Sequence, residues 1–382
     1  MTSPPIIKIR EAEEPRDLVH RCVQALAEGQ IVVMPTETIY GVAASVLVPH
    51  AVERLADMKG RKQGHAFTLA LKSAEEIWDY VPDLPAVAWR LARRAWPGPL
   101  TLVVESRHPL SAARRFPPQV QQLVCPEGTL GFRVPDHFFI SEVLRLLPAP
   151  LVLTSVNKTG EPPARSAEEA AANLPEVDII FDDGPAVHGI ASTVVKIEDG
   201  SWTILREGVL SKTAIAEMAS AVILFVCAGN TCRSPMAQAL CQAMLAEKLG
   251  CSPQQLRDFG VVVRSAGLEA YGGDGASPQA IEVLKQRGIN LEGHMSQQLT
   301  DSLVQDADRI FAMTRALKEA VLARWPDAAD RIDCLDPHGQ DIADPFGGPL
   351  QAYEQCAKLI EDALRDRCEE LLRLVVVPRS GA

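Results

Sequence analysis

The chain lacks several features that would place it in other classes of protein. It has no run of about eighteen uncharged apolar residues, so we expect no segment that crosses a membrane. Met1–Glu14 has no apolar core of the kind that a secretory leader requires. It also lacks a Cys-x-x-Cys pair and a cysteine–histidine array, which argues against structural zinc. The nine cysteines are an odd number without paired spacing, and this favours free thiols in a reducing cytoplasm.

An excess of positive charge is absent as well. The formal net charge is −11, and both halves of the chain carry more acidic than basic side chains. Neither half is therefore the strongly basic domain that tight, nonspecific binding of nucleic acid requires. With 47% hydrophobic and 23% charged residues, the composition is typical of a globular protein. A length of 382 residues predicts two or three domains.

The most informative motif is the sequence Cys-Ala-Gly-Asn-Thr-Cys-Arg that runs from Cys227 to Arg233. It follows the apolar run Ala221–Val226 and precedes the helical pattern Met236–Leu249. A loop between a strand and a helix directs backbone N–H groups and the positive end of the helix at an anion. Such surroundings favour a thiolate, so we expect the pKa of Cys227 to be lowered. The motif predicts a phosphate-binding loop with a thiol nucleophile and an arginine that can hold two phosphate oxygens.

Other residues of the loop agree with this interpretation. Gly229 and Asn230 tolerate the left-handed backbone that a tight anion-binding loop needs. The Ser234 hydroxyl can donate a hydrogen bond to a thiolate. Cys232 has two compatible interpretations: a small apolar filler under the loop, or a thiol that forms a reversible disulfide with Cys227 under oxidation.

The loop closely resembles that of the low-molecular-weight protein tyrosine phosphatase family, whose pattern is Cys-x-Gly-Asn-x-Cys-Arg-Ser-Pro. The resemblance implies a small doubly wound parallel sheet over 221–376, with a second strand before Arg264-Ser265-Ala266-Gly267 and a third at Asp308–Met313. It implies that Cys227 is the nucleophile, that Arg233 binds the phosphoryl group, and that an Asp-Pro aspartate is the general acid. Asp344-Pro345-Phe346-Gly347-Gly348 fits better than Asp336-Pro337, because Phe346 stands where the family has an aromatic residue. The phosphate-binding loop would then comprise Ala228, Gly229, Asn230, Thr231, Cys232 and Ser234.

The substrate of this half is predicted less sharply. Thr231 together with Asp344-Pro345-Phe346-Gly347-Gly348 resembles the bacterial protein-arginine phosphatases of the family. The sequence therefore favours protein phosphoarginine, with phosphotyrosine as the alternative. A third alternative is an arsenate-reductase-like thiol enzyme, which needs a resolving pair of cysteines. Cys334, Cys356 and Cys368 are too far apart in the sequence to look like that pair.

Strand-like and helix-like segments alternate unevenly in the first two hundred residues, which predicts an α/β layer with a mixed sheet. The expected strands are Ile31–Met34, Leu100–Val104, Leu130–Val134, Leu151–Leu153, Ile179–Phe181, Thr193–Ile197 and Trp202–Leu205. The expected helices are Arg16–Glu28, His50–Met58, Ala86–Ala95, Ile140–Leu147 and Ala167–Asn173. Hydroxyl, amide and cationic side chains gather near the strand ends. The Gly-x-x-x-x-Gly-Lys loop is missing, so the pattern alone predicts only an anion site.

From Ile6 to Gly208 the chain is similar to the YrdC-type threonylcarbamoyl-AMP synthases. The resemblance rests on Pro-Thr-Glu-Thr-x-Tyr-Gly from Pro35, Lys-x-Arg from Lys59, Trp-Pro-Gly-Pro-Leu-Thr from Trp96 and Ser-x-Asn from Ser155. It implies a mixed twisted sheet with an open groove. It also implies condensation of L-threonine, bicarbonate and ATP to threonylcarbamoyl-AMP with release of pyrophosphate, for the modification of adenosine 37 of tRNA.

The resemblance also assigns roles to individual residues. The threonine-binding group would be Thr36, Arg133, Thr154 and Ser192. The ATP-binding group would be Lys59, Arg61, Thr129, Ser155, Asn157 and Arg206. Magnesium would accompany ATP, and no cofactor is expected for the phosphatase half. Further partners would be tRNA and the tRNA threonylcarbamoyltransferase machinery.

Two departures from the synthase pattern are visible, the stretch Lys62–Thr68 and Pro163. They leave open an alternative in which this half is a non-catalytic RNA- or nucleotide-binding module that regulates the phosphatase. The prediction from the whole chain is a cytoplasmic fusion of two enzymes: a synthase domain over 6–208, a linker over 209–220 and a phosphatase domain over 221–376.

Overall fold

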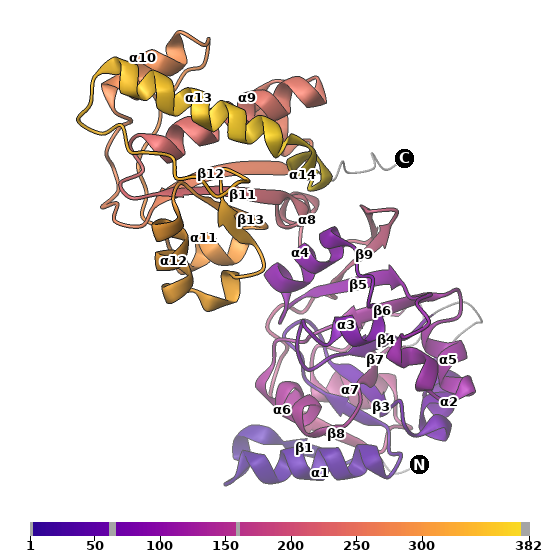
Figure 1. Ribbon diagram of the computed structural model, residues 1–382. Coiled ribbons are helices and arrows are strands. Elements are labelled where there is room, and N and C mark those ends of the chain that lie inside the picture. The colour runs from indigo at the N-terminus through magenta and orange to yellow at the C-terminus, as the bar shows by residue number, and fades with distance from the viewer. Residues whose placement is uncertain (1–2, 61–65, 158–160, 376–382) are drawn as a thin grey trace. The chain divides into compact units, whose positions relative to one another are not determined.

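The computed structural model describes residues 3–60, 66–157 and 161–375, and these fall into two compact units (Figure 1). In the described residues the first unit extends to Met218 and the second begins at Ala219. The segment 209–220 contains a helix, α8 (Lys212–Ala219). Each unit has its own sheet and its own hydrophobic core.

The described residues of the first unit form a ten-stranded mixed sheet in the order β1-β8-β2-β3-β7-β4-β6-β5-β9-β10. Parallel pairs (β1/β8, β8/β2, β4/β6 and β5/β9) are interspersed with antiparallel ones. The strands are β1 (Ile6–Lys8), β2 (Val32–Met34), β3 (Gly41–Ser45), β4 (Thr68–Ala70), β5 (Leu100–Glu105), β6 (Thr129–Arg133), β7 (Leu151–Ser155), β8 (Ile179–Asp182), β9 (Thr193–Glu198) and β10 (Ser201–Arg206).

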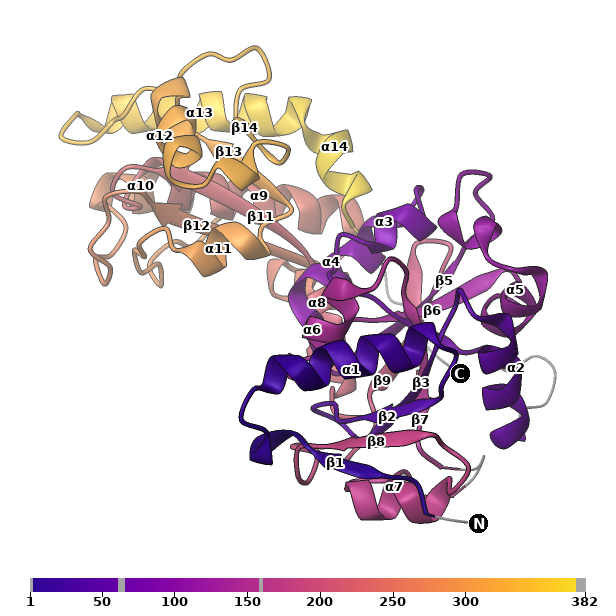
Figure 2. The ribbon, with the colours of Figure 1, turned by 90° about the horizontal axis from the view of Figure 1, so that it is seen from below.

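Helices lie beside this sheet, and α1 packs against α6 (Figure 2). The helices are α1 (Pro15–Ala27), α2 (Pro49–Met58), α3 (Ile77–Tyr80), α4 (Ala86–Ala95), α5 (Pro118–Val124), α6 (Phe138–Leu146) and α7 (Ala167–Asn173), with 3-10 turns η1 (Ile9–Glu11) and η2 (Ala112–Arg115). Apolar residues at helical spacing, such as Cys22 and Leu26 on α1, are fully buried against Val32 and Met34 of β2. This packing leaves polar strand residues elsewhere on the sheet free to line a cavity.

The second unit has a four-stranded parallel sheet in the order β12-β11-β13-β14. Its strands are β11 (Ala221–Cys227), β12 (Val261–Gly267), β13 (Arg309–Ala312) and β14 (Ile332–Cys334). Its helices are α9 (Arg233–Leu249), α10 (Pro278–Lys285), α11 (Asp301–Asp306), α12 (Arg315–Arg324), α13 (Leu350–Asp366) and α14 (Cys368–Arg373), with 3-10 turns η3 (Pro253–Arg257) and η4 (Pro326–Ala328).

Strand β11 explains why helices cover both faces of this sheet. Successive side chains of a strand point to opposite faces. Ile223, Phe225 and Cys227 belong to the core under α9 and α13, whereas Leu224 and Val226 belong to the core under α11 and α12. Figure 1 shows these helix pairs on opposite sides of the sheet. The predicted doubly wound parallel fold is confirmed.

The predicted elements agree closely with those observed. The helix predicted at Ala86–Ala95 has those bounds, and the strand predicted at Ala221–Val226 is one residue longer. The mixed sheet of the first unit is also confirmed. Short strands such as β3 and β4 escaped prediction, because runs of three to five residues give little periodicity.

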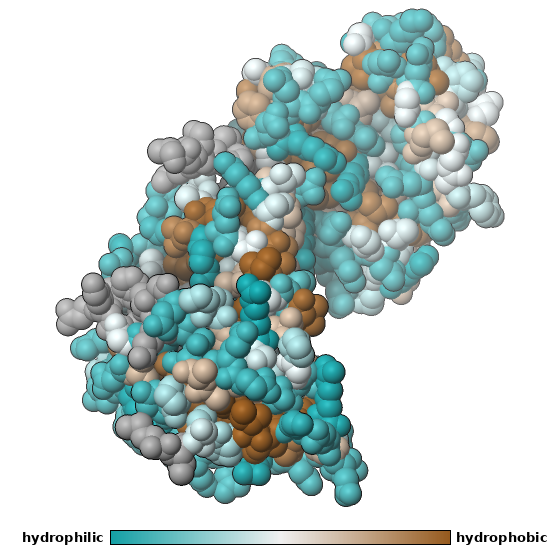
Figure 3. Space-filling view, turned by 180° about the vertical axis from the view of Figure 1, so that it is seen from behind, coloured by the Kyte–Doolittle hydropathy of each residue, from teal (hydrophilic) through white to brown (hydrophobic). Residues whose placement is uncertain are grey.

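Hydrophilic residues cover most of the face shown in Figure 3, and hydrophobic ones form small groups. In the described ranges, no helix has both the length and the apolar character that a bilayer span requires.

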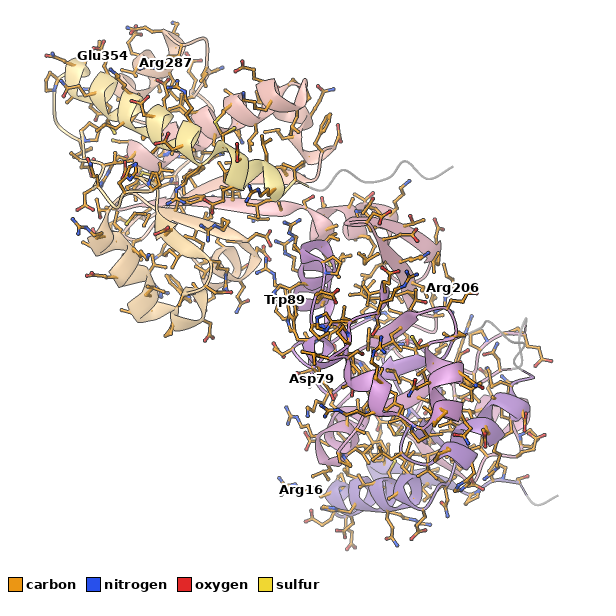
Figure 4. All side chains as sticks on the ribbon, turned by 45° about the vertical axis from the view of Figure 1, so that its right-hand side comes forward. Arg16, Asp79, Trp89, Arg206, Arg287 and Glu354 are labelled. Carbon is orange, nitrogen blue, oxygen red and sulfur yellow. The ribbon has the colours of Figure 1, made fainter. Side chains whose placement is uncertain are left out.

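Polar contacts also join helices inside the second unit. Arg287, which follows α10 and is labelled in Figure 4, donates a hydrogen bond to Glu361 of α13 over 2.7 Å.

Candidate active sites

A cavity of about 240 Å³ lies over the central strands of the first unit. It collects residues from β3, β4, β5, β6, β7, β9 and β10 and from the segment between β2 and β3. Of the residues predicted for threonine and ATP, those in its lining are Thr36, Thr129, Arg133, Thr154, Ser155, Ser192 and Arg206. The structure thus gathers side chains that are up to 170 residues apart in the sequence.

Arg133 is the most tightly held cation of this cavity. It is 6% exposed, and its Nη2 donates to Glu37 Oε1 and to Thr38 Oγ1, both over 2.7 Å. Its Nε donates to the Gly98 carbonyl over 3.3 Å. The second carboxylate oxygen of Glu37 accepts the N–H of Asp136 over 3.1 Å. Among the described residues the remaining guanidinium nitrogen, Nη1, makes no hydrogen bond, and Arg133 lines the cavity.

A second cation, Arg206 at the end of β10, faces the same cavity and is labelled in Figure 4. Its Nη2 donates to the Ser192 carbonyl over 2.8 Å and to the Ser192 hydroxyl over 3.3 Å. Burial and the positive charge of Arg133 both lower the pKa of Arg206. Within the described chain, no carboxylate lies within ion-pair distance of Arg206. Two cations sharing one cavity favour a ligand with negative charge.

Hydroxyl groups complete the lining. Ser192 and Thr101 share a hydrogen bond of 2.9 Å between their side-chain oxygens. Thr36 Oγ1 donates to the Ile39 carbonyl over 2.6 Å and lies 2.9 Å from Thr38 Oγ1. Glu37, Thr38 and Thr101 were part of quoted motifs but were assigned no role. Their contacts with predicted residues now show that they position Arg133 and Ser192.

Two described residues that were predicted to bind ATP, Lys59 and Asn157, stand apart from this lining. Lys59 Nζ donates to the carbonyls of Ser155 and Asn157 and is 4% exposed, so it ties the end of β7 to α2. Asn157 accepts from the Ser155 hydroxyl and donates to the Glu161 carbonyl. Neither side chain lines the cavity. Arg61 lies outside the described residues, as does most of the departure Lys62–Thr68.

A pocket of about 330 Å³ forms the candidate site of the second unit. It lies after β11 and at the start of α9, where parallel sheets of this type place ligands. Predicted residues in its lining are Cys227, Ala228, Gly229, Thr231, Cys232, Arg233, Asp344 and Phe346. Glu269, Ala270, Tyr271 and Asp274 also line it, and the sequence interpretation did not identify them.

Asn230 holds the phosphate-binding loop in shape and is fully buried. Its φ of 56° is the left-handed conformation that was predicted, whereas Gly229 does not adopt it. The Asn230 side-chain amide donates to the hydroxyls of Ser234 and Ser265, each over 2.9 Å. Its side-chain oxygen accepts the Gln297 N–H, and its backbone carbonyl accepts His294 Nε2–H. Ser265, His294 and Gln297 were missed as supporting residues, because they are distant in the sequence.

The Cys227 sulfur sits at the base of the pocket and is 2% exposed. Ser234 Oγ lies 2.9 Å from the sulfur, and the Asn230 N–H donates to it over 3.2 Å. Burial raises the pKa of the Cys227 thiol, while Ser234, Asn230 and Arg233 lower it; the net direction is upward. The predicted lowering of the Cys227 pKa is therefore wrong in direction, because the loop motif does not show how completely the sulfur is buried.

Arg233 and Asp344 meet at the wall of the pocket. Arg233 Nη2 donates to Asp344 Oδ2, and Nη1 donates to the Ile342 carbonyl over 3.2 Å. Arg233 Nε is buried, and no hydrogen-bond partner for it exists among the described residues. The Asp344 side chain is 43% exposed, so it can reach a bound group from the solvent side. The structure thus brings the predicted nucleophile, phosphate-binding arginine and general acid together.

The remaining cysteines are free thiols. Cys232 lies beside Ser277 and Tyr353, with its sulfur 3.4 Å and 3.5 Å from their side-chain oxygens. It belongs to the hydrophobic core, as its interpretation as a filler requires. Across the described part of the chain, no group of three or more histidine, cysteine or carboxylate side chains could hold a metal ion.

Comparison with known proteins divides the chain at the same place. Residues 24–208 match the family described as telomere recombination, which takes in the YciO and YrdC proteins. A putative threonylcarbamoyl-AMP synthase of Mycobacterium tuberculosis is 34% identical over 198 residues, which are 51% of this chain and 86% of that protein. The threonylcarbamoyl-AMP synthase of Pyrococcus abyssi is 31% identical over 186 residues, 48% of this chain. The chain spans about half (52%) of the length of that archaeal relative.

Residues 222–376 match the family described as low molecular weight phosphotyrosine protein phosphatase. The protein-arginine-phosphatase of Bacillus subtilis is 38% identical over 154 residues, 39% of this chain and 95% of that protein. A probable low-molecular-weight protein-tyrosine-phosphatase of Ralstonia solanacearum is 41% identical over 140 residues, 36% of this chain and 88% of that protein. The chain therefore belongs to two enzyme families, the threonylcarbamoyl-AMP synthases through its N-terminal half and the low-molecular-weight protein phosphatases through its C-terminal half.

Proposed function

We propose that the first unit makes threonylcarbamoyl-AMP from L-threonine, bicarbonate and ATP, with release of pyrophosphate, for the modification of adenosine 37 of tRNA. The observation that carries this proposal is the shared cavity of Arg133 and Arg206, lined by hydroxyl groups. Arg133 Nη1 would bind the threonine carboxylate, since the other guanidinium nitrogens are already engaged. The hydroxyls of Thr36 and Ser192 would orient the amino acid.

Catalysis of this kind needs positioning more than a nucleophile. The amino group of threonine forms a bond to the carbon of bicarbonate, and water leaves to give a carbamate. A carbamate oxygen then attacks the α-phosphorus of ATP while pyrophosphate leaves. Holding the two groups in line supplies a large part of the rate. Arg206 would offset charge on the phosphates. Magnesium would enter with ATP as part of the substrate, since the described residues form no metal cluster of their own.

A pyrophosphate assay on the full chain tests this proposal. Release of pyrophosphate should require both L-threonine and bicarbonate. Binding of ATP or tRNA without such release would favour the alternative, a nucleic-acid- or nucleotide-binding module that regulates the phosphatase. Addition of tRNA and the threonylcarbamoyltransferase machinery would then show whether the product reaches adenosine 37.

For the second unit, we infer hydrolysis of protein phosphoarginine through a phosphocysteine intermediate. The arrangement of the Cys227 sulfur, Arg233 and Asp344 around one pocket carries this inference. The Cys227 thiolate attacks phosphorus, the bond to the leaving nitrogen or oxygen breaks, and Asp344 protonates that atom. Water then attacks the phosphocysteine and releases phosphate, with Asp344 accepting the proton. Asp344 must exchange its contact with Arg233 for the leaving group before it can act.

Thr231 is the reason for preferring phosphoarginine over phosphotyrosine. Thr231 lines the pocket, and a threonine hydroxyl group can hydrogen-bond a polar leaving group. Phosphotyrosine is the second candidate, because relatives of both kinds match this half equally well. A side-by-side assay on phosphoarginine and phosphotyrosine peptides of matched sequence decides between them. Faster hydrolysis of phosphotyrosine would reject the preference for phosphoarginine without affecting the proposed nucleophile.

A further inference from the structure

The phosphate pocket of the second unit carries opposite charges at different depths. Cys227 and Arg233 form its inner end, with exposures of 2% and 6%. Glu269 and Asp274 line the same pocket but are exposed at its rim, and Tyr271 between them is 100% exposed. These three residues belong to the segment after β12, outside the phosphate-binding loop. We refer to Glu269, Tyr271 and Asp274 as the acidic rim.

The acidic rim is held in place by the backbone. The Glu269 N–H donates to the Ala228 carbonyl of the phosphate-binding loop over 3.0 Å. The Asp274 N–H donates to the Ser296 hydroxyl over 3.0 Å, and the Asp274 carbonyl accepts the Ser296 N–H over 2.7 Å. Within the ranges that the structure describes, neither carboxylate has a cationic partner. Two exposed carboxylates on an anchored backbone segment therefore line this pocket without a neighbouring cation among these residues.

The inner end of the pocket carries a buried cation. Arg233 is more than nine-tenths buried, lines the pocket and has an Nε without a hydrogen-bond partner among the described residues. A substrate with only negative charge would be attracted by Arg233 and repelled by the acidic rim. The pocket therefore suits a substrate that is negative at its inner end and positive at its outer end.

The geometry points to the acidic rim as a cation-binding subsite that selects phosphorylated substrates carrying a guanidinium or ammonium group. Glu269 and Asp274 pair with the positive charge, and the exposed ring of Tyr271 offers a face for a cation–π contact. This inference rests on the proposed phosphatase function and names its substrate class. Two sources of the cation fit this chemistry: the guanidinium of phosphoarginine itself, or a lysine or arginine next to the phosphorylated residue.

The test compares the full chain with the double variant Glu269→Gln/Asp274→Asn on three peptides. These are a phosphotyrosine peptide with neutral flanks, the same peptide with lysine flanks, and a phosphoarginine peptide with neutral flanks. The readout is the ratio of kcat/KM for each cationic peptide to that for the neutral one, which cancels any loss of folded enzyme. Because the rim is exposed, we expect the ratio to fall about three- to tenfold in the double variant. The preference of the unsubstituted chain should also weaken at high salt.

The two cationic peptides separate the sources of the charge. A loss confined to phosphoarginine identifies its own guanidinium, and a loss for lysine flanks identifies a neighbouring residue. The matched control is Glu319→Gln/Asp327→Asn, which removes the same charge from exposed positions on α12 and η4. Unchanged ratios in the rim variant, or an equal fall in the control variant, would overturn the inference.

Binding of the same peptides to the Cys227→Ser chain, with and without the rim substitutions, separates this inference from the proposed function. A preference for cationic peptides that disappears with the rim substitutions supports the subsite even if turnover is never seen. Equal binding of all three peptides would reject the subsite even if hydrolysis proceeds as proposed.

Discussion

The two units assemble their candidate anion-binding sites in different ways. In the second unit, the proposed nucleophile, the arginine and the backbone donors come from the seven consecutive residues Cys227–Arg233, between β11 and α9. In the first unit, the described lining of the cavity comes from seven strands, and Arg133 is held by Glu37, which lies 96 residues away in the sequence. A compact motif can be found in a sequence by its spacing, whereas a dispersed site becomes visible only when the sheet assembles it.

This contrast explains what the sequence could and could not predict. Cys227 and Arg233 were assigned from the loop motif and Asp344 from the family resemblance, and the structure brings these three residues together. Arg133 and Arg206 were assigned by resemblance, and both reach the cavity. Lys59 was assigned to ATP by the same resemblance, and that assignment stays a prediction. Its Nζ donates to the carbonyls of Ser155 and Asn157, which lie 96 and 98 residues further along the chain.

The sequence also could not predict the electrostatics of the phosphate pocket. The pattern correctly indicates which groups favour a thiolate, but the balance depends on the burial of Cys227. Burial is a property of packing against α9 and α13, and no local pattern encodes it. The acidic rim was not predicted for a similar reason, since nothing in Glu269-Ala270-Tyr271 indicates that this segment borders a pocket.

Among the substitutions that test this comparison of the two units, Asp344→Asn is expected to have the largest effect on a reaction rate. Loss of the general acid should slow phosphocysteine formation by about a hundred- to ten-thousandfold for substrates with poor leaving groups. An activated aryl phosphate needs little protonation and should be affected far less. Rapid-mixing kinetics on both substrates measures the difference, and an equal loss on both would reject Asp344 as the acid.

Arg133→Ala should weaken the first unit by about a hundredfold in kcat/KM for threonine, since a charge-assisted contact to the carboxylate is lost. It also leaves Glu37 buried without its partner, which costs about 3–5 kcal/mol of folding free energy. Denaturation of the first unit should therefore be measured alongside pyrophosphate release. Arg133→Ala/Glu37→Gln removes the unpaired charge, so it should recover stability but not threonine binding.

A smaller effect, roughly tenfold in rate near neutral pH, is expected from Ser234→Ala. The Ser234 hydroxyl lowers the pKa of Cys227, so its removal should raise that pKa further. Phosphatase activity increases as Cys227 ionises, and the variant should therefore need a higher pH to reach the same fraction of its maximum. Alkylation of Cys227 as a function of pH measures this directly, and an unshifted profile would remove Ser234 from the account.

The smallest effect, a few-fold change, is expected from Thr231→Val, which removes a hydroxyl and leaves the shape of the side chain nearly unchanged. Hydrolysis of phosphoarginine should fall relative to that of phosphotyrosine. The ratio of kcat/KM for matched peptides reports the change. A ratio equal to that of the unsubstituted chain would show that Thr231 does not discriminate between them.

The most direct test of two separate sites is a crossed assay on the full chain carrying either Cys227→Ser or Arg133→Ala. Phosphate release from a phosphopeptide and threonine-dependent release of pyrophosphate from ATP are measured in each variant. The account predicts that Cys227→Ser abolishes phosphate release and leaves pyrophosphate release intact, with the reverse pattern for Arg133→Ala. Phosphatase activity that survives Cys227→Ser, or a loss of both activities from that single change, would contradict it.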